Sequence, residues 1–408
     1  MSFKNSKTVN PGNLFPLIIL LAMCSCMHST PPFYIMDYYV EDDYPINSVS
    51  SASDLEYQQL MAEATKGGWP GFTFLIDGPD GFWAGGGGRV DIASRIDMRK
   101  NQMFKIGSVT KVFTAALILD LEEDGLLSID EKAEKYLPDE MVRKVSNLDE
   151  ATIEQLLNHK SGIPNFFGYN IAAMNYNLEY YNHFPNFNKS KEELIEFVYG
   201  YPAPFAPGDN WVYSNTNYVL LAMIAERITG KSYAQLLKER IFIPLELDHT
   251  GVEREGFVQG LARGYDAFYG DSRFYDTSRD NMGIGGTGDG GIISNTYDIA
   301  KFFHALFNLE LFSSEQLNKM ITQYPYNSWQ EKGQAMTSGY TLGMFYEARD
   351  GQAQYYSHQG YVFGYGSDAY YFPDKDTVIV MLTNMTGSEK ADEKRAPFFD
   401  IIDRFAYK

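Results

Sequence analysis

The chain has only two cysteines among its 408 residues, Cys24 and Cys26, and both lie close to the N-terminus. The sequence beyond them therefore offers no disulfide framework, no thiolate metal site and no cysteine nucleophile. The six histidines show no metal-ligand spacing either, so we expect no bound metal. The chemistry of this chain has to rest on other side chains.

Positive charge is also scarce, because 34 Lys and Arg stand against 53 Asp and Glu, which gives a formal net charge of −19. Nucleic acid and anionic membrane surfaces repel such a chain, so we expect no nucleic-acid partner. Hydrophobic residues make up 44% and charged residues 21%, which is typical of a globular protein. A chain of this length can bury a sizeable core or form two lobes around a cleft, and a small molecule or a peptide is the expected partner.

A membrane-spanning run is missing at the N-terminus, since the apolar stretch 14–23 is too short to cross a bilayer. It follows Lys4 and Lys7 and ends in small residues and cysteine, which is typical of a secretory signal. Its end resembles a bacterial lipobox, in which a cysteine is lipidated and becomes the new N-terminus. Cys26 follows a small residue, whereas Cys24 has a leucine at the usual distance.

These features predict a lipoprotein signal peptide over residues 1–26, a tether over 27–53 and a folded domain over 54–405. A lipid on Cys26 or Cys24 would hold the protein at a membrane of the bacterial cell envelope. A plain secretory signal with two incidental cysteines is the alternative.

Strand patterns lie at both ends of the domain and helical patterns lie in the middle. Helices are expected over 54–66, 108–125, 296–307 and 390–405, and strands over 71–77, 82–85, 339–346, 354–358, 369–372 and 377–384. Residues 130–285 read as mostly helical. Tail strands joined by short turns should pair as an antiparallel meander.

The predicted fold class is therefore α+β, with an antiparallel sheet flanked by helices and an inserted, mainly helical lobe. The α+β lobe is expected to comprise about 54–125 and 288–405, and the helical lobe about 126–287. A ligand cleft is expected where the two lobes meet.

The first motif with chemical meaning is Ser108-Val-Thr-Lys111 at the start of a long apolar helix. Residues three apart share one face of a helix, so the lysine can approach the serine hydroxyl. A buried lysine loses proton affinity and can accept the serine proton. An N-capping Ser108 with an exposed Lys111 is the structural alternative.

The second motif is Tyr213-Ser-Asn215, in a loop that leads into the expected helix from Tyr218. A phenol beside an ammonium can relay a proton, and an amide can hold both the lysine and a substrate carbonyl. The similar Tyr180-Tyr-Asn182 lacks the preceding Pro-Gly turn, so we discount it.

The third motif is His358-Gln-Gly360, at the end of an expected strand. A glycine there lets a substrate backbone approach the strand edge. The N–H of Tyr361 can then form an oxyanion hole with the N–H of Ser108. His249-Thr-Gly251 matches the same pattern but lies outside the strand meander, so we interpret it as structural.

Together the three motifs resemble those of serine β-lactamases and penicillin-binding proteins. With Tyr-x-Asn as the second motif, the chain is similar to the branch of class C β-lactamases, D-alanyl-D-alanine carboxypeptidases, D-aminopeptidases and related esterases. Segment 156–163 resembles that branch's Leu-Leu-x-His-x-Ser-Gly, and 288–294 with 298–302 resembles its glycine-rich turn and helix. The resemblance covers about 54–405.

The resemblance implies acyl transfer without a metal or organic cofactor. Ser108 attacks an amide or ester carbonyl, Lys111 and Tyr213 relay its proton, and Asn215 orients the substrate. Tyr213 then activates the water that releases the acyl-enzyme. Peptidoglycan-derived or other D-amino-acid peptides and small esters are the expected substrates.

One departure concerns the third motif, because β-lactamases of this branch usually have Lys where this chain has His358. A histidine at this position makes the motif similar to that of the peptidase and esterase members. A neutral His358 would bind a substrate carboxylate only weakly. His358 is expected to assist proton transfer or recognition. A β-lactamase and a catalytically silent periplasmic receptor remain the alternatives.

A histidine, an aromatic segment and two glycine-rich stretches lie outside the three motifs. His159 is expected to brace the cleft. Residues 166–187, rich in Tyr, Phe and Asn, form either a lid over the pocket or surface packing of the helical lobe. The glycine-rich stretches 85–88 and 283–291 lack a following Gly-Lys-Ser/Thr, so neither is a phosphate loop, and the second predicts a tight turn near the cleft.

Overall fold

The computed structural model describes residues 38–66, 71–168, 173–183, 187–253, 260–266, 274–279, 285–331, 334–387 and 389–407. Asp37–Lys408 form one compact unit. The predicted signal peptide, with Cys24 and Cys26, lies outside the described residues. Among the described residues, no helix is long and apolar enough to cross a bilayer.

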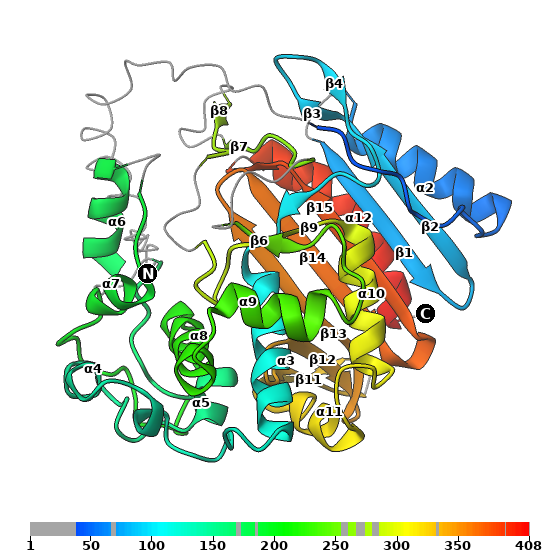
Figure 1. Ribbon diagram of the computed structural model, residues 1–408. Helices are drawn as coiled ribbons and strands as arrows, with labels where there is room; N and C mark the ends of the chain where they lie inside the picture. The colour runs from blue at the N-terminus through cyan, green and yellow to red at the C-terminus, as the bar shows by residue number, and fades with distance from the viewer. Residues whose placement is uncertain are drawn as a thin grey trace, which may run out of the picture. The chain divides into compact units, whose positions relative to one another are not determined.

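An eight-stranded antiparallel sheet forms the centre of this unit, in the order β10-β11-β12-β13-β14-β15-β1-β2 (Figure 1). Its strands are β1 (Phe72–Gly78), β2 (Gly81–Gly87), β10 (Tyr324–Glu331), β11 (Gln334–Tyr340), β12 (Phe345–Arg349), β13 (Gln352–Val362), β14 (Tyr365–Phe372) and β15 (Thr377–Thr383). The six C-terminal strands are a meander, and the N-terminal hairpin pairs with its last strand. The predicted sheet built from both ends of the chain, and thus the fold class, is confirmed.

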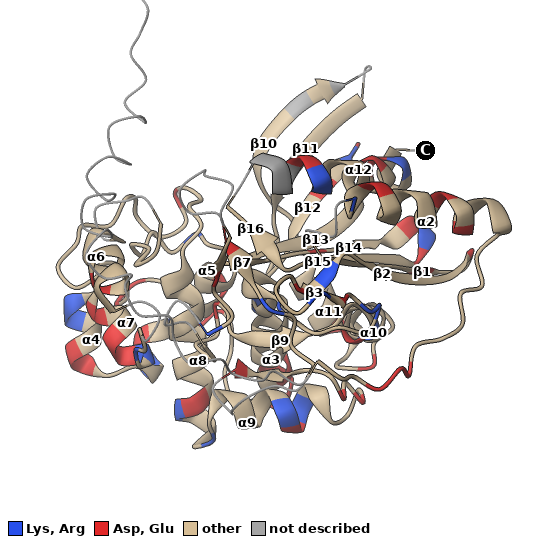
Figure 2. Ribbon diagram, turned by 90° about the horizontal axis from the view of Figure 1, so that it is seen from above, with Lys and Arg blue, Asp and Glu red and all other residues tan. Residues whose placement is uncertain are grey.

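The central strands are buried on both faces, because helices cover the sheet from both sides. Every residue of β14 and β15 is buried. Figure 2 shows α2 (Ser51–Ala64) and α12 (Glu389–Tyr407) on one side and α10 (Thr296–Phe307) on the other. The first two helices share one apolar cluster with the sheet, which includes Tyr57, Phe74 and Phe398. The resulting layers are helix, sheet and helix.

Two helices of the remaining region are buried almost all round. In α3 (Thr110–Glu123) eleven residues are buried, and so are the first eleven of α8 (Asn215–Thr229). The other helices of this region are α4 (Asp139–Lys144), α5 (Ile153–Leu157), α6 (Ala173–His183), α7 (Lys191–Glu196), α9 (Tyr233–Leu237) and α11 (Ser314–Met320). Helices that are apolar all round belong in a core, so α3 and α8 carry their N-termini into the interior.

Short strands complete the unit in three small sheets. They are β3 (Arg89–Asp91) with β4 (Ile96–Asp97); β5 (Phe104–Lys105), β9 (Ile292–Ser294) and β6 (Gly251–Val252); and β16 (Met385–Thr386), β7 (Tyr265–Asp266) and β8 (Tyr275–Asp276). Because β5 pairs with β9, the chain just before Ser108 is held against the strand that follows the glycine-rich turn.

Two boundaries differ from the sequence prediction. Helix α2 begins at Ser51 with Ser50 as its N-cap, and Val40 and Tyr44 are buried. The Tyr44 hydroxyl lies 3.1 Å from Thr296 Oγ1, so the part of the predicted tether that the structure describes packs on the domain. The domain therefore starts before residue 54.

The predicted strand 339–346 is wrong, because it spans the end of β11, a turn and the start of β12. Strand β10 and most of β11 were missed. Strand β10 is the edge of the sheet and has mostly exposed residues, with Pro325 and Asn327 at an irregularity in its register. An edge strand without an alternating apolar face carries little sequence signal.

Candidate active site

Ser108 lies in a single 3₁₀ turn, Gly107–Val109, immediately before α3. We call these three residues the serine turn. Ser108 is partly exposed, whereas its neighbours in the turn are buried. Gly107 has a φ of +49°, which is accessible to glycine at little cost. A hydroxyl is thus presented to solvent from an otherwise buried helix start.

The serine turn packs directly on strand β13, and glycines on both sides make this approach possible. A Cβ on Gly107 would lie 2.6 Å from the nitrogen of Tyr361, and a Cβ on Gly360 would collide with the carbonyl oxygen of Ile106. The same carbonyl accepts a 2.7 Å hydrogen bond from Ser367 Oγ on β14. The spacing between the turn and the strand is therefore fixed.

The register of β13 directs the N–H of Tyr361 toward this turn. The β13–β14 hairpin closes at Val362 and Tyr365 around a two-residue turn. Val362 and Tyr365 exchange both of their backbone hydrogen bonds, whereas the next pair, Tyr361 and Gly366, exchanges none. The N–H of Tyr361 therefore points away from β14. On the side of β13 that faces away from β14, the neighbouring strand is β12. Among the described residues, β12 pairs with β13 only as far as Ser357 and does not reach Tyr361.

Lys111 is fully buried and its ammonium nitrogen lies among three acceptors. Lys111 Nζ is 3.0 Å from Ser108 Oγ, 2.8 Å from Asn215 Oδ1 and 2.6 Å from the carbonyl oxygen of Asp289. The last two are carbonyl oxygens, which can only accept hydrogen bonds. The rings of Tyr213 and Tyr218 lie 5.0 and 5.5 Å from Nζ.

Burial lowers the pKa of Lys111 to about 7, against a smaller opposing effect of the Asp289 charge. Removal from water disfavours the ammonium form. A large part of the molecules then carry a neutral amine near neutral pH. The alternative of an N-capping Ser108 with an exposed Lys111 is wrong.

Tyr213 comes from the loop that precedes α8 and shares a hydrogen bond with Ser108. Burial holds the pKa of its phenol well above 10, so Tyr213 is a neutral phenol rather than a phenolate. The loop is fixed by His159, whose Nδ1 accepts a 3.2 Å hydrogen bond from the N–H of Ser214. The rings of His159 and Tyr213 lie 4.3 Å apart between centroids.

His159 therefore braces the loop of the second motif, in agreement with the prediction. It is fully buried, and burial lowers its pKa well below 6.5. Asn215 starts α8, and its N–H donates to Asn165 Oδ1 at 3.0 Å. Because Asn215 Oδ1 faces the lysine, its amide nitrogen is turned away from Lys111.

His358 lies on β13 and is buried, and both of its ring nitrogens face protein atoms. Nδ1 is 2.7 Å from the carbonyl oxygen of Gln359, and Nε2 is 3.0 Å from the Tyr340 hydroxyl. A carbonyl can only accept, so Nδ1 carries the proton and Nε2 accepts from Tyr340. Burial, helped by the Lys111 charge, lowers the pKa of His358 to about 3, so the ring is neutral.

The two motif duplicates lie elsewhere. Tyr180 is buried in α6 among other aromatic rings and stacks on Phe363 at 5.6 Å. In the other duplicate, the N–H of His249 and the hydroxyl of Thr250 donate to the carboxylate of Asp298 at 2.9 and 2.8 Å. Both duplicates thus have structural contacts, which matches the interpretation made from the sequence.

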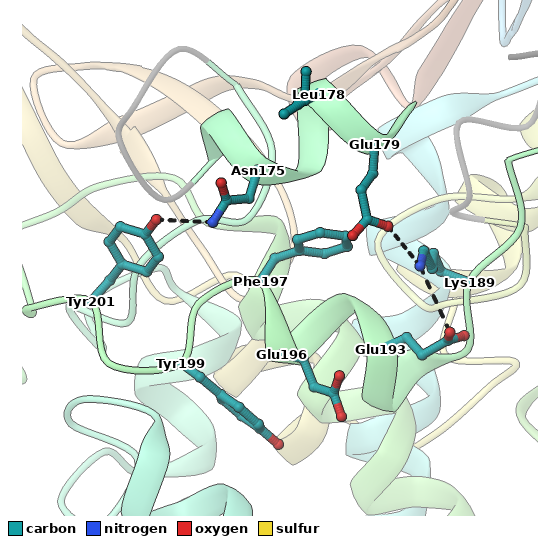
Figure 3. A pocket seen from close by; sticks show the side chains of 9 residues that line it. All are labelled: Asn175, Leu178, Glu179, Lys189, Glu193, Glu196, Phe197, Tyr199 and Tyr201. Carbon is teal, nitrogen blue, oxygen red and sulfur yellow. Dashed lines mark hydrogen bonds and ion pairs between the residues drawn. The ribbon is translucent and has the colours of Figure 1, made fainter. Parts of the chain in front are cut away.

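The aromatic segment 166–187 packs as a cluster where the structure describes it, with Tyr176 against Phe166 and Phe187. A cavity of about 380 Å³ lies beside α6 and α7 (Figure 3). Lys189 pairs there with Glu179 at 2.8 Å and with Glu193 at 3.8 Å. None of the residues predicted for the catalytic site lines this cavity.

Two residues of the site, Asp289 and Tyr340, belong to none of the three sequence motifs. Asp289 was read only as part of a tight turn, and Tyr340 fell inside a wrongly placed strand. Neither belongs to a local motif with its partner, since Asp289 is 178 residues from Lys111 and Tyr340 is 18 residues from His358. Only their partners in space identify them.

Comparisons with known proteins identify the family. The model of the Beta-lactamase family matches residues 57–400. Penicillin-binding protein 4* of Bacillus subtilis is 27% identical over 326 residues, which cover 77% of this chain and 68% of that protein. A putative D-alanyl-D-alanine carboxypeptidase of Escherichia coli K12 is 25% identical over 334 residues, which cover 72% of each.

A solved D-stereospecific amidohydrolase from Streptomyces sp. superposes with a TM-score of 0.68 at 27% identity, covering 80% of this chain and 93% of that one. The amidohydrolase shares the fold of this chain, and the family match confirms the family inferred from the three motifs. The chain belongs to the beta-lactamase family, whose members are serine hydrolases.

Proposed function

We propose that this chain hydrolyses amide or ester bonds of small D-amino-acid-type substrates through an acyl-enzyme on Ser108. The observation that carries the proposal is the surroundings of Lys111 Nζ. A neutral lysine has two N–H groups and one lone pair. Asn215 Oδ1 and the Asp289 carbonyl accept the two N–H groups, so the lone pair is left facing Ser108 Oγ.

In the first step, Ser108 Oγ forms a bond to the substrate carbonyl carbon while its proton passes to Lys111 Nζ. The N–H groups of Ser108 and Tyr361 stabilise the oxyanion. The bond to the leaving group then breaks, and the leaving group takes a proton from the Tyr213 phenol, which regains one from the Lys111 ammonium. No metal or organic cofactor takes part.

In the second step, water attacks the acyl carbon and Lys111 accepts its proton, with Tyr213 as the relay. The bond between the acyl carbon and Ser108 Oγ then breaks, the acid product leaves, and Ser108 Oγ takes a proton back from the Lys111 ammonium. The raised pKa of Tyr213 argues against a phenolate that activates water by itself. Tyr213 is therefore assigned as a neutral donor that passes protons between Lys111 and the reacting oxygen or nitrogen. Asn215 presents its amide N–H to the substrate carbonyl.

The substrate class follows from the neutral state of His358. A histidine with both nitrogens engaged and a pKa of about 3 provides no positive charge for a substrate carboxylate. This favours substrates without a carboxylate at that end, such as amides and esters, over β-lactams. The D-stereospecific amidohydrolase and the putative D-alanyl-D-alanine carboxypeptidase support a D-amino-acid acyl group.

The side of the site beyond Tyr213 is aromatic and suits an apolar acyl group. Trp211 stacks on Tyr326 with 4.4 Å between ring centroids, and Phe345 lies parallel to Tyr213 at 6.3 Å. Aromatic faces provide large apolar contact areas. His358 supports this wall from the sheet, at 5.2 Å from Phe345, and so acts as a positioning residue.

The test is intact-mass analysis after incubation with a fluorophosphonate and, separately, with benzylpenicillin. We expect a stable phosphonyl adduct on the wild type and none on Ser108→Ala. A lasting penicillin adduct would indicate a penicillin-binding protein, and rapid penicillin turnover a β-lactamase. No adduct with either probe on a folded wild type would refute the proposal and favour a silent receptor.

We also propose that a lipid on Cys26 or Cys24 anchors the protein in the bacterial cell envelope. The basic residues before the apolar run and the bacterial relatives support this location. Mass spectrometry of the membrane fraction after expression of Cys24→Ala and Cys26→Ala tests it. The lipidated N-terminal peptide should vanish with only one of the two substitutions, and its absence from the wild type would contradict the anchor.

A further inference from the structure

Asp289, whose backbone carbonyl contacts the lysine of the site, also carries a buried carboxyl group. It lies within the glycine-rich stretch and is only 2% exposed. Its backbone carbonyl accepts the 2.6 Å hydrogen bond from Lys111 Nζ, and its side-chain Oδ1 accepts a 2.7 Å hydrogen bond from Thr287 Oγ1. One residue thus contributes both a neutral acceptor and an acid group to the surroundings of Lys111.

A buried carboxyl group without a nearby cation is unfavourable, because its charged form loses the solvation of water. Burial raises the pKa of Asp289, and the positive charge of Lys111 opposes that rise. The charge of Asp289 in turn opposes the lowering of the Lys111 pKa by burial. Each of the two charges therefore stabilises the other, and both side chains are buried.

Several elements contribute the other polar and titratable groups around Lys111. They are Ser108, the phenols Tyr213 and Tyr218, the amide of Asn215, and the imidazoles His159 and His358. The phenols and imidazoles are held neutral by burial. Among the described residues, Asp289 is thus the acid whose charge acts on Lys111.

We propose that Asp289 is the internal counterion of Lys111 and sets the pH above which Ser108 becomes reactive. The inference rests on the proposed function, because it concerns the same lysine as the base. When Lys111 takes the serine proton, a positive charge forms where water cannot solvate it, and the Asp289 carboxylate stabilises that charge. The backbone carbonyl cannot do so alone, since it carries no net charge.

The substitution Asp289→Asn removes the charge and keeps the backbone carbonyl and the side-chain volume. The labelling rate of Ser108 by a fluorophosphonate should rise with pH as Lys111 loses its proton. Without the carboxylate the ammonium is less stable, so this rise should move to lower pH by half a unit or more. The maximal rate should also fall severalfold, because the lysine has become a weaker base.

The matched control is Asp298→Asn, which removes another buried carboxylate that is 1% exposed and bound to His249 and Thr250. Its pH profile should coincide with that of the wild type. If Asp289→Asn does not fold, as judged by circular dichroism, Asp289→Ala replaces it. A folded variant with an unshifted profile would overturn the inference.

A second measurement keeps the inference separate from the proposed function. Lysine labelled with carbon-13 at Cε allows the protonation of Lys111 to be followed by NMR, with Lys111→Arg for assignment. The Lys111 titration should move to lower pH in Asp289→Asn whether or not Ser108 reacts. Absence of labelling in the wild type would refute the proposed function, whereas an unmoved Lys111 titration would refute the counterion.

Discussion

The pH dependence of Ser108 labelling follows quantitatively from the burial of Lys111. A lysine with the ordinary pKa of 10.5 is neutral in about one molecule in 3,000 at pH 7, whereas a pKa of about 7 makes about half of the molecules neutral. The buried site thus increases the population of the base by roughly 10³. Because the neutral form is the active one, the rate should fall about tenfold for each pH unit below 7 and level off above it.

Lys111→Arg should abolish this behaviour, because a guanidinium stays protonated at every accessible pH. The labelling rate with a fluorophosphonate, followed by intact mass from pH 5.5 to 9, should fall by roughly 10²–10⁴ and lose its break near pH 7. Lys105→Arg is the matched control, since Lys105 is 1% exposed in its side chain and pairs with Glu253 at 2.6 Å. A wild-type profile without a break, or Lys111→Arg labelling within threefold of the wild type, would refute the role of this lysine.

Three further predictions concern the strand edge and two ion pairs. Gly360→Ala should separate β13 from the serine turn and reduce the labelling rate by about 10²–10³, the usual effect of losing one oxyanion donor. The circular dichroism spectrum should stay unchanged. An unaffected labelling rate would argue against the N–H of Tyr361 as an oxyanion donor. Arg395→Ala should lower the free energy of unfolding in urea by about 3–5 kcal/mol, because it leaves the fully buried Asp368 without the partner 2.6 Å away, and a loss below 1 kcal/mol would contradict this. Burial works against protonation of His304, but Asp77 and Asp376 together outweigh burial and raise the pKa, and Asp77, at 3.4 Å, is the closer partner. This pair therefore stabilises the fold below pH 6.5 and ceases to do so as the pH rises through the raised pKa. Asp77→Asn should cost about 0.5–1 kcal/mol at pH 5.5 and less at pH 8.5 in urea titrations, whereas an equal loss at both pH values would exclude His304 as the cause.

The sequence predicted well those elements whose burial is visible in their own pattern of apolar residues. Strand β15 and helix α3 are continuous apolar runs because both are covered on all sides. Strand β10 has exposed residues on both faces and an irregular register, so its period does not distinguish it from a loop. Residues 38–50 look like a tether because the buried Val40 and Tyr44 are separated by three acidic residues and follow no helix or strand period.

The sequence by itself determined the α+β class, and its motifs singled out Ser108, Lys111 and Tyr213 as the residues proposed for acyl transfer, because the motifs combine the residue types that this chemistry requires. Only the tertiary structure decided the state of each group. Burial makes Lys111 a base near neutral pH, and contacts from distant strands turn His358 into a neutral support. Proton affinities depend on solvation and on neighbours in space, and neither is encoded within a few residues of the group itself.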